Sequence, residues 1–166
     1  TAAQVRGSLQ ESRRGEGDAV HEVLGSLRPL HWIEAPGTLD GGDVLRIDKR
    51  VFVGISARSN VAGRAQLRGL LAPHGYTVEG VATRECLHLK SAGTRVAEDT
   101  LLVNPAWLAD ATPFAGYRMI EVDPGEEHAA NAVRVGESIL YPACFPKTLE
   151  RLRAEGIDVT TVDVSE

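Results

Sequence analysis

Residues 43–81, DVLRIDKRVFVGISARSNVAGRAQLRGLLAPHGYTVEGV, decide the fold of this chain. Two short β-type runs, VLRI and VFVGI, flank a turn at 48–50 and predict a β-hairpin. A helix is predicted over 59–74, because leucines recur on one face, a Ser-Asn pair can cap its start and Gly75 suits its end. YTVEGV then predicts another strand, so the unit reads strand, strand, helix, strand.

The same pattern recurs twice downstream. TRVAED and TLLV precede a short helix that opens at Pro105 and the strand YRMIEV, and NAVRV and SILYP precede a helix from Pro146 and the strand IDVTTVDV. Upstream, a helix over 16–27 and the strand LHWIEA predict the tail of another unit. We therefore expect an α/β fold of repeated ββαβ modules. Because no linker interrupts the pattern, we expect a single domain over 1–166.

Composition narrows the class of protein. The chain has 166 residues, 43% of them hydrophobic and 25% charged, which is typical of a soluble globular domain. A net charge of -5 argues against nucleic-acid and anionic-membrane partners. No apolar run reaches the roughly 20 residues of a membrane span and no secretory signal is visible, so we expect a cytoplasmic protein. The two cysteines have no zinc-binding spacing, and we expect no metal.

Two titratable residues are candidates for chemistry. Asp40 precedes a glycine pair in TLDGGDV, where glycines permit positive φ and close ligand approach, although an ordinary turn is favoured from spacing alone. His88 lies in the strand-like run LHLKS and can act as acid and base near neutral pH, or it is a satisfied, partly buried histidine. Both stand at the entrance to the first β-run of successive repeats. If the repeats surround an axis, both side chains can reach one central site.

Arginines and cysteines complete the candidates. Arg13 and Arg58 precede predicted helices and can clamp a carboxylate in bidentate fashion, although solvated surface arginines are favoured without further information. Cys86 and Cys144 are interpreted as packing residues.

Several of these runs together resemble dimethylarginine dimethylaminohydrolase: ESRRGE, IEAPGTLDGGDV, SARSN, LHLKS and the AAN of AANAVRV. The resemblance covers essentially the whole chain. It implies the guanidino-group-modifying, or pentein, superfamily, whose fold is a five-bladed α/β propeller of ββαβ modules around a central active site. This chain would hold about three modules and part of a fourth.

The resemblance also implies residue roles. His88 matches the catalytic histidine, Asp40 its acidic partner, and Arg13 and Arg58 the positions that hold the amino-acid end of a small-molecule substrate. Lys90 stands where arginine deiminases carry an aspartate, which favours N-methylated guanidines. The implied reaction hydrolyses N-omega-methylated arginine to citrulline and methylamine or dimethylamine through a cysteine thiouronium intermediate, without any cofactor.

The family's nucleophilic cysteine lies in a Gly-Gly-x-x-Cys segment beyond a strand similar to IDVTTVDVSE, and its N-terminal module carries acidic residues that bind the guanidinium. We therefore expect this chain to be the central portion of the propeller, lacking both parts and inactive alone. The alternatives are a non-catalytic subunit that binds guanidino compounds, or another superfamily enzyme such as an arginine deiminase or an amidinotransferase. The preferred methylarginine and the oligomeric state, including a homo-oligomer, stay open.

Overall fold

The predicted hairpin forms in the computed structural model, which describes residues 2–5, 16–27 and 29–165. Strand β3 (Val44–Ile47) pairs antiparallel with β4 (Arg50–Ile55), and β5 (Thr77–Ala82) adds to the other side of β4. Asp48 in the hairpin turn has a φ of 50°, a conformation that Asp tolerates better than most residues. These strands belong to the first of two compact units, Thr1–Val81 and Ala82–Glu166.

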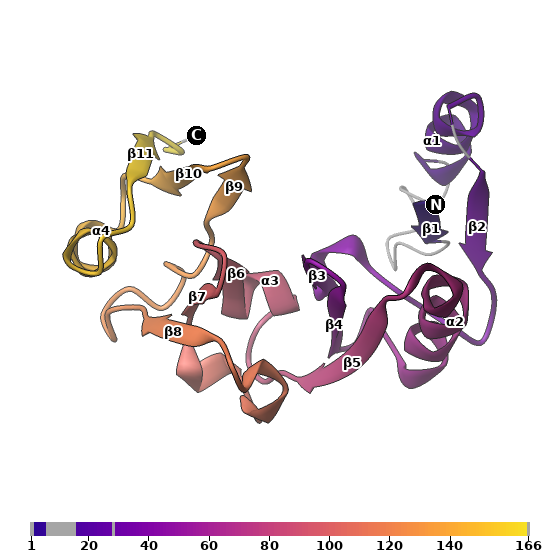
Figure 1. Ribbon diagram of the computed structural model, residues 1–166, viewed down its shortest axis with the longest axis horizontal. Coiled ribbons are helices and arrows are strands. Elements are labelled where there is room, and N and C mark those ends of the chain that lie inside the picture. The colour runs from indigo at the N-terminus through magenta and orange to yellow at the C-terminus, as the bar shows by residue number, and fades with distance from the viewer. Residues whose placement is uncertain (1, 6–15, 28, 166) are drawn as a thin grey trace. The chain divides into compact units, whose positions relative to one another are not determined.

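Helix α2 (Val61–Leu71) follows β4 and begins two residues later than predicted. The delay arises because Asn60 keeps an extended backbone and accepts a hydrogen bond from the Gly63 N–H as the N-cap. A 3-10 turn continues the helix to Gly75, whose φ of 75° ends it. The helix lies between β2 (Leu30–Ile33) and the three-stranded sheet (Figure 1), and Leu67 joins a core cluster with Ile33, Leu39, Val51, Val53 and Val78.

The segment between β2 and the Asp40 turn is fastened to α2 by side chains of the helix. Gln66 exchanges two hydrogen bonds with the backbone of Glu34, at 2.7 and 2.8 Å. Asn60 accepts from the Thr38 N–H, donates to the Pro36 carbonyl, and its own N–H donates to the Thr38 carbonyl. These bonds hold residues 34–38 against the start of α2 and so fix where the chain enters the Asp40 turn.

Substitution of two glycines of α2 can test how closely residues 34–38 approach this helix. A Cβ at the buried Gly63 would overlap the Thr38 carbonyl oxygen, whereas nothing lies within 4 Å of a Cβ at the exposed Gly69. We predict that Gly63→Ala lowers the free energy of unfolding by roughly 1 to 3 kcal/mol through overpacking. The matched Gly69→Ala should raise it by roughly 0.5 to 1 kcal/mol, because alanine loses less backbone entropy in a helix.

Urea denaturation of both variants measures the two effects. Equal stabilities for Gly63→Ala and Gly69→Ala would show that residues 34–38 do not pack closely on α2.

The second unit repeats the arrangement twice. In the first repeat, β6 (Gly93–Arg95) pairs antiparallel with β7 (Thr100–Val103), which pairs parallel with β8 (Arg118–Glu121). In the second, β9 (Val133–Val135) is antiparallel and β11 (Val159–Val162) parallel to β10 (Ser138–Pro142), with α4 (Pro146–Ala154) between β10 and β11. This strand order confirms the predicted ββαβ repeats.

The helix predicted from Pro105 differs from the structure. Only two 3-10 turns form there, Pro105–Trp107 and Thr112–Phe114. The first turn ends where Leu108 takes an extended backbone, with φ -97° and ψ 116°, and pairs with Thr83 in an isolated antiparallel β-bridge. The large side chains of this segment still serve the core, since Trp107, Leu108 and Phe114 are buried.

The N-terminal part contains one strand that the sequence did not indicate. Strand β1 (Ala2–Val5) pairs parallel with β2, and α1 (Glu16–Gly25) lies between them in the chain. This βαβ arrangement agrees with the predicted tail of another module. Within the described residues, no helix combines the length and the apolar character that crossing a bilayer requires.

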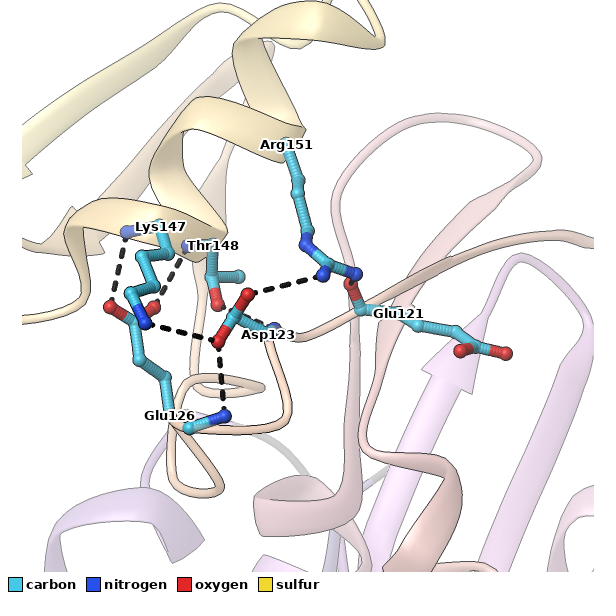
Figure 2. Close-up of polar contacts among 7 residues, drawn as sticks. Glu121, Asp123, Glu126, Lys147, Thr148 and Arg151 are labelled. Atoms are coloured by element: carbon cyan, nitrogen blue, oxygen red, sulfur yellow. Dashed lines mark hydrogen bonds and ion pairs between the residues drawn. The ribbon is translucent and has the colours of Figure 1, made fainter.

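Acidic side chains of the β8–β9 loop hold the start of α4 (Figure 2). The first residues of α4 have no side-chain cap of their own, and the carboxylate of Glu126 instead accepts from the N–H groups of Lys147 and Thr148. Asp123 accepts a hydrogen bond from Arg151 at 3.1 Å and lies 3.8 Å from the Lys147 ammonium. The loop therefore supplies the helix cap that the local sequence lacks.

Asp123 makes this contact sensitive to pH. The hydrogen bond from the Gly125 N–H and the charges of Lys147 and Arg151 hold the pKa of Asp123 below its usual 3.8, against an opposing effect of burial. Because the folded pKa lies below the unfolded one, the stabilisation is complete above pH 3.8 and is lost as the pH falls through the folded pKa.

We predict that Asp123→Asn lowers the Tm at pH 7, and that its difference from wild type shrinks as the pH falls below 3.8. The matched change Glu150→Gln, at an exposed position of α4, should leave the profile unchanged. Thermal unfolding between pH 7 and pH 2 measures this, and a pH-independent difference would contradict the role of the Asp123 charge.

Candidate functional site

Asp40 ends the fastened segment and starts a single 3-10 turn, Gly41–Asp43, that leads directly into β3. Its backbone is extended, and one carboxylate oxygen accepts a hydrogen bond from the Gly42 N–H at 2.8 Å. Neither glycine of the pair adopts the positive φ that glycine permits, because both belong to this 3-10 turn. Nothing lies within 4 Å of a Cβ placed on Gly41, so the face of the turn beside Asp40 is open.

Arg58 comes close to Asp40 from the loop between β4 and α2. Its Nη1 lies 4.0 Å from the second carboxylate oxygen of Asp40, and each side chain is 28% exposed. An ion pair of this length and exposure contributes little stability. The structure thus brings together two of the predicted site residues in an arrangement that a ligand carboxylate can replace at low cost.

A buried carboxylate beneath this pair was not singled out by the sequence. Asp43 is fully buried, and its Oδ2 accepts hydrogen bonds from the hydroxyls of Ser56 and Ser59, each at 2.7 Å. The Ser59 hydroxyl in turn accepts from the Asp40 N–H at 2.9 Å, and the Ser56 hydroxyl accepts from the Arg58 N–H at 3.0 Å. The available signal was the pair of serines on either side of Arg58 in SARSN.

His88 lies in the second unit, at the start of the short helix α3 (Leu89–Ala92). The expectation of a strand-like run at 86–91 is wrong, because Leu89 and Ala92 turn inward as one helical turn while Leu87 is 58% exposed. His88 itself is partly buried and has an extended backbone, with φ -143° and ψ 154°.

Asp40 and His88 hold equivalent places in successive modules. Each is the N-cap residue of a single helical turn, and each turn runs directly into the first strand of its sheet, β3 or β6. This confirms the predicted equivalence of the two positions along the repeat.

The remaining residues discussed from the sequence are Arg13, Cys86 and Cys144. Arg13 lies outside the described residues. Cys86 is partly buried, in keeping with a packing role, whereas Cys144 is exposed and its interpretation as a packing residue is wrong. Among residues 2–5, 16–27 and 29–165, no group of three or more His, Cys, Asp or Glu side chains is arranged to hold a metal ion.

A cavity of about 620 Å³ lies behind the turn, between the β3–β4 hairpin and α2. Its wall combines apolar side chains with the charged groups of Arg46 and Lys49. The Lys49 ammonium is already engaged, 2.9 Å from the His74 carbonyl oxygen and 4.1 Å from the Tyr76 ring centroid. It provides a second place where a small molecule could bind, distinct from the Asp40–Arg58 pair.

Solved structures share this fold. The chain superposes on a dimethylarginine dimethylaminohydrolase from Pseudomonas aeruginosa, a mutant complexed with citrulline, with a TM-score of 0.86, 32% identity and coverage of 99% of this chain and 64% of the other. An inosamine-phosphate amidinotransferase from Streptomyces griseus gives a TM-score of 0.77 at 16% identity over 95% of this chain and 57% of the other. The modules therefore define an α/β protein of the pentein class.

Sequence comparison narrows the class. The chain is 34% identical to the curated dimethylarginine dimethylaminohydrolase of Pseudomonas aeruginosa and 40% identical to that of Streptomyces coelicolor, over 94% of this chain in both cases. It spans about three fifths of these relatives, 62% and 60% of their lengths. No family model matches it. The resemblance to the dimethylarginine dimethylaminohydrolases is confirmed: the chain is a homologue of these enzymes.

Proposed function

We propose that this chain is the part of a dimethylarginine-hydrolysing enzyme that carries the catalytic histidine, its acidic partner and an arginine for the amino-acid end of the substrate. One observation supports this most directly. The homology to enzymes of that name coincides with the polar pair Asp40 and Arg58, and with His88 at the position equivalent to Asp40 in the next module.

The proposed reaction proceeds in two steps. A cysteine thiolate forms a C–S bond to the guanidinium carbon of an N-omega-methylated arginine, the C–N bond to the methylated amine breaks, and the imidazolium of His88 gives its proton to that amine. The neutral imidazole then takes a proton from a water molecule while the oxygen of that water attacks the thiouronium carbon. The C–S bond breaks, and citrulline and the thiolate are released.

Asp40 and Arg58 would support this chemistry without taking part in bond making. A carboxylate near the imidazole stabilises its protonated form and so favours the proton donor needed in the first step. The guanidinium of Arg58 offers two parallel N–H donors to the substrate carboxylate. Arg13 is proposed for the same end of the substrate.

We place the nucleophilic cysteine after the strand that corresponds to β11, and neither Cys86 nor Cys144 matches it. The chain by itself would then bind substrate or product without turnover. Lys90, exposed on α3 two residues after His88, favours a methylated guanidine over arginine, since an aspartate there would suit an unsubstituted guanidinium.

Isothermal titration calorimetry with citrulline tests whether Arg58 binds the amino-acid end of the ligand. Arg58→Ala should weaken binding by roughly 2 to 3 kcal/mol, about 30- to 150-fold, because a charge-assisted hydrogen-bond partner is lost. Arg58→Lys should restore only part of this, since an ammonium lacks the planar fork. Arg46→Ala, an exposed arginine on β3 of the same unit, is the control and should leave the Kd unchanged. Equal Kd values for Arg58→Ala and wild type would remove Arg58 from the site.

Turnover tests the histidine and its partner. In a form of the protein that continues through the proposed cysteine, His88→Asn should abolish citrulline formation and leave binding intact, because both proton transfers are lost. Asp40→Asn should also reduce kcat strongly, and the double variant should be little worse than either single one, since the two residues act as a unit.

The matched control is His128→Asn, which changes an exposed histidine of the same unit. Citrulline formation by residues 1–166 alone that disappears in Cys86→Ser or Cys144→Ser would overturn the placement of the nucleophile.

A further inference from the structure

We infer that Asp43 is a positioning residue of the proposed site: its buried carboxylate fixes the backbone at both Asp40 and Arg58 through the hydroxyls of Ser59 and Ser56. The roles of Asp40 and Arg58 rest on the proposed function. The bridging by Asp43 rests on the geometry of the first unit alone.

The two serine hydroxyls can each donate only one hydrogen bond. A serine hydroxyl has one proton to donate and lone pairs that accept. Both protons go to Oδ2 of Asp43, at 2.7 Å, the short distance expected when the acceptor is a carboxylate. Each hydroxyl oxygen is thereby oriented as an acceptor, and the N–H groups of Asp40 and Arg58 donate to them.

The two bridges run in parallel from one oxygen atom. Through Ser59 the carboxylate reaches the residue whose side chain caps the 3-10 turn, and through Ser56 it reaches the loop residue whose guanidinium faces that turn. The long ion pair between the Asp40 carboxylate and the Arg58 guanidinium is too weak to fix their spacing. The Asp43 carboxylate therefore fixes it, by holding the backbone of both residues through the two serine hydroxyls.

Burial makes this arrangement rigid. Asp43 and Ser59 are each fully buried, and a buried carboxylate that loses its donors would be costly, so the hydroxyls cannot turn away without a large penalty. In Asp43→Asn, an amide nitrogen at the place of Oδ2 would meet two hydroxyl protons, and an amide oxygen there is a weaker acceptor. One or both hydroxyls would rotate and release the N–H groups above.

The test uses residues 1–166 and two readouts. Amide hydrogen exchange followed by NMR reports the individual N–H groups, with the Val53 amide of β4 as the reference for global opening. Calorimetry with citrulline reports the site. Asp43→Asn should accelerate exchange at both Asp40 and Arg58 at least about 10-fold relative to Val53, and should raise the citrulline Kd roughly 10- to 100-fold.

Serine variants make the inference specific to each bridge and replace Asp43→Asn if that variant does not fold. Ser59→Ala should accelerate exchange at Asp40 and spare Arg58. Ser56→Ala should accelerate exchange at Arg58 and at Ser59, whose N–H also donates to the Ser56 hydroxyl at 3.2 Å, more than at Asp40. In the Ser59→Ala background, Asp43→Asn should have no further effect on Asp40.

The matched control is Glu79→Gln, which weakens a structural pair with Arg50 in the same sheet. It should lower the Tm and leave the exchange ratios and the Kd unchanged. A response of Asp43→Asn like that of the control, lower stability with unchanged ratios and Kd, would overturn the inference. If wild type binds no citrulline, the proposed function fails, and the exchange ratios still decide whether Asp43 holds the two backbones.

Discussion

The close contact between helix α2 and residues 34–38 is the constraint on which the first unit depends. The side chains of Asn60 and Gln66 hydrogen-bond to the backbone of that segment. Gly63 has no side chain, which leaves room for the Thr38 carbonyl to lie against the helix. The segment connects β2 to the turn before β3, so its position decides where Asp40 stands. The helix therefore positions a polar group on a loop, together with the buried side chain of Leu39 just before Asp40.

Two successive modules share one local structure just before their first strands, β3 and β6. A polar residue with an extended backbone caps a single helical turn, and the turn leads into the first strand of the sheet. The local support of the cap residue differs between the modules. In the first module, the buried carboxylate of Asp43 and the hydroxyls of Ser56 and Ser59 support Asp40. In the second, the buried side chains of Leu89 and Ala92 anchor the turn. A repeated fold can thus place an aspartate and a histidine at equivalent positions with different local support.

The sequence predicted the parts that depend on periodicity and on capping. The hairpin at 43–55, α4 and the repeat order follow from alternation, from an apolar helical stripe and from Pro and Gly at the helix ends. The helix predicted from Pro105 is only a 3-10 turn because Leu108 pairs with the distant Thr83 in a β-bridge, which no local pattern encodes. The strand-like run LHLKS was wrong because one turn of helix is too short to show a period. Asp43 was not singled out because its meaning lies in hydrogen bonds to residues 13 and 16 positions away, which no local pattern encodes.

We propose that the Asp40 turn and the Arg58 loop bind the amino-acid product of guanidine hydrolysis. A two-dimensional NMR titration of residues 1–166 with citrulline tests it directly, because each backbone N–H reports its own surroundings. The largest shifts are expected at Gly42 and Arg58, which adjoin or carry the proposed site residues. Shifts confined to Lys49, His74 and Tyr76, around the 620 Å³ cavity, or no shifts at all, would contradict it.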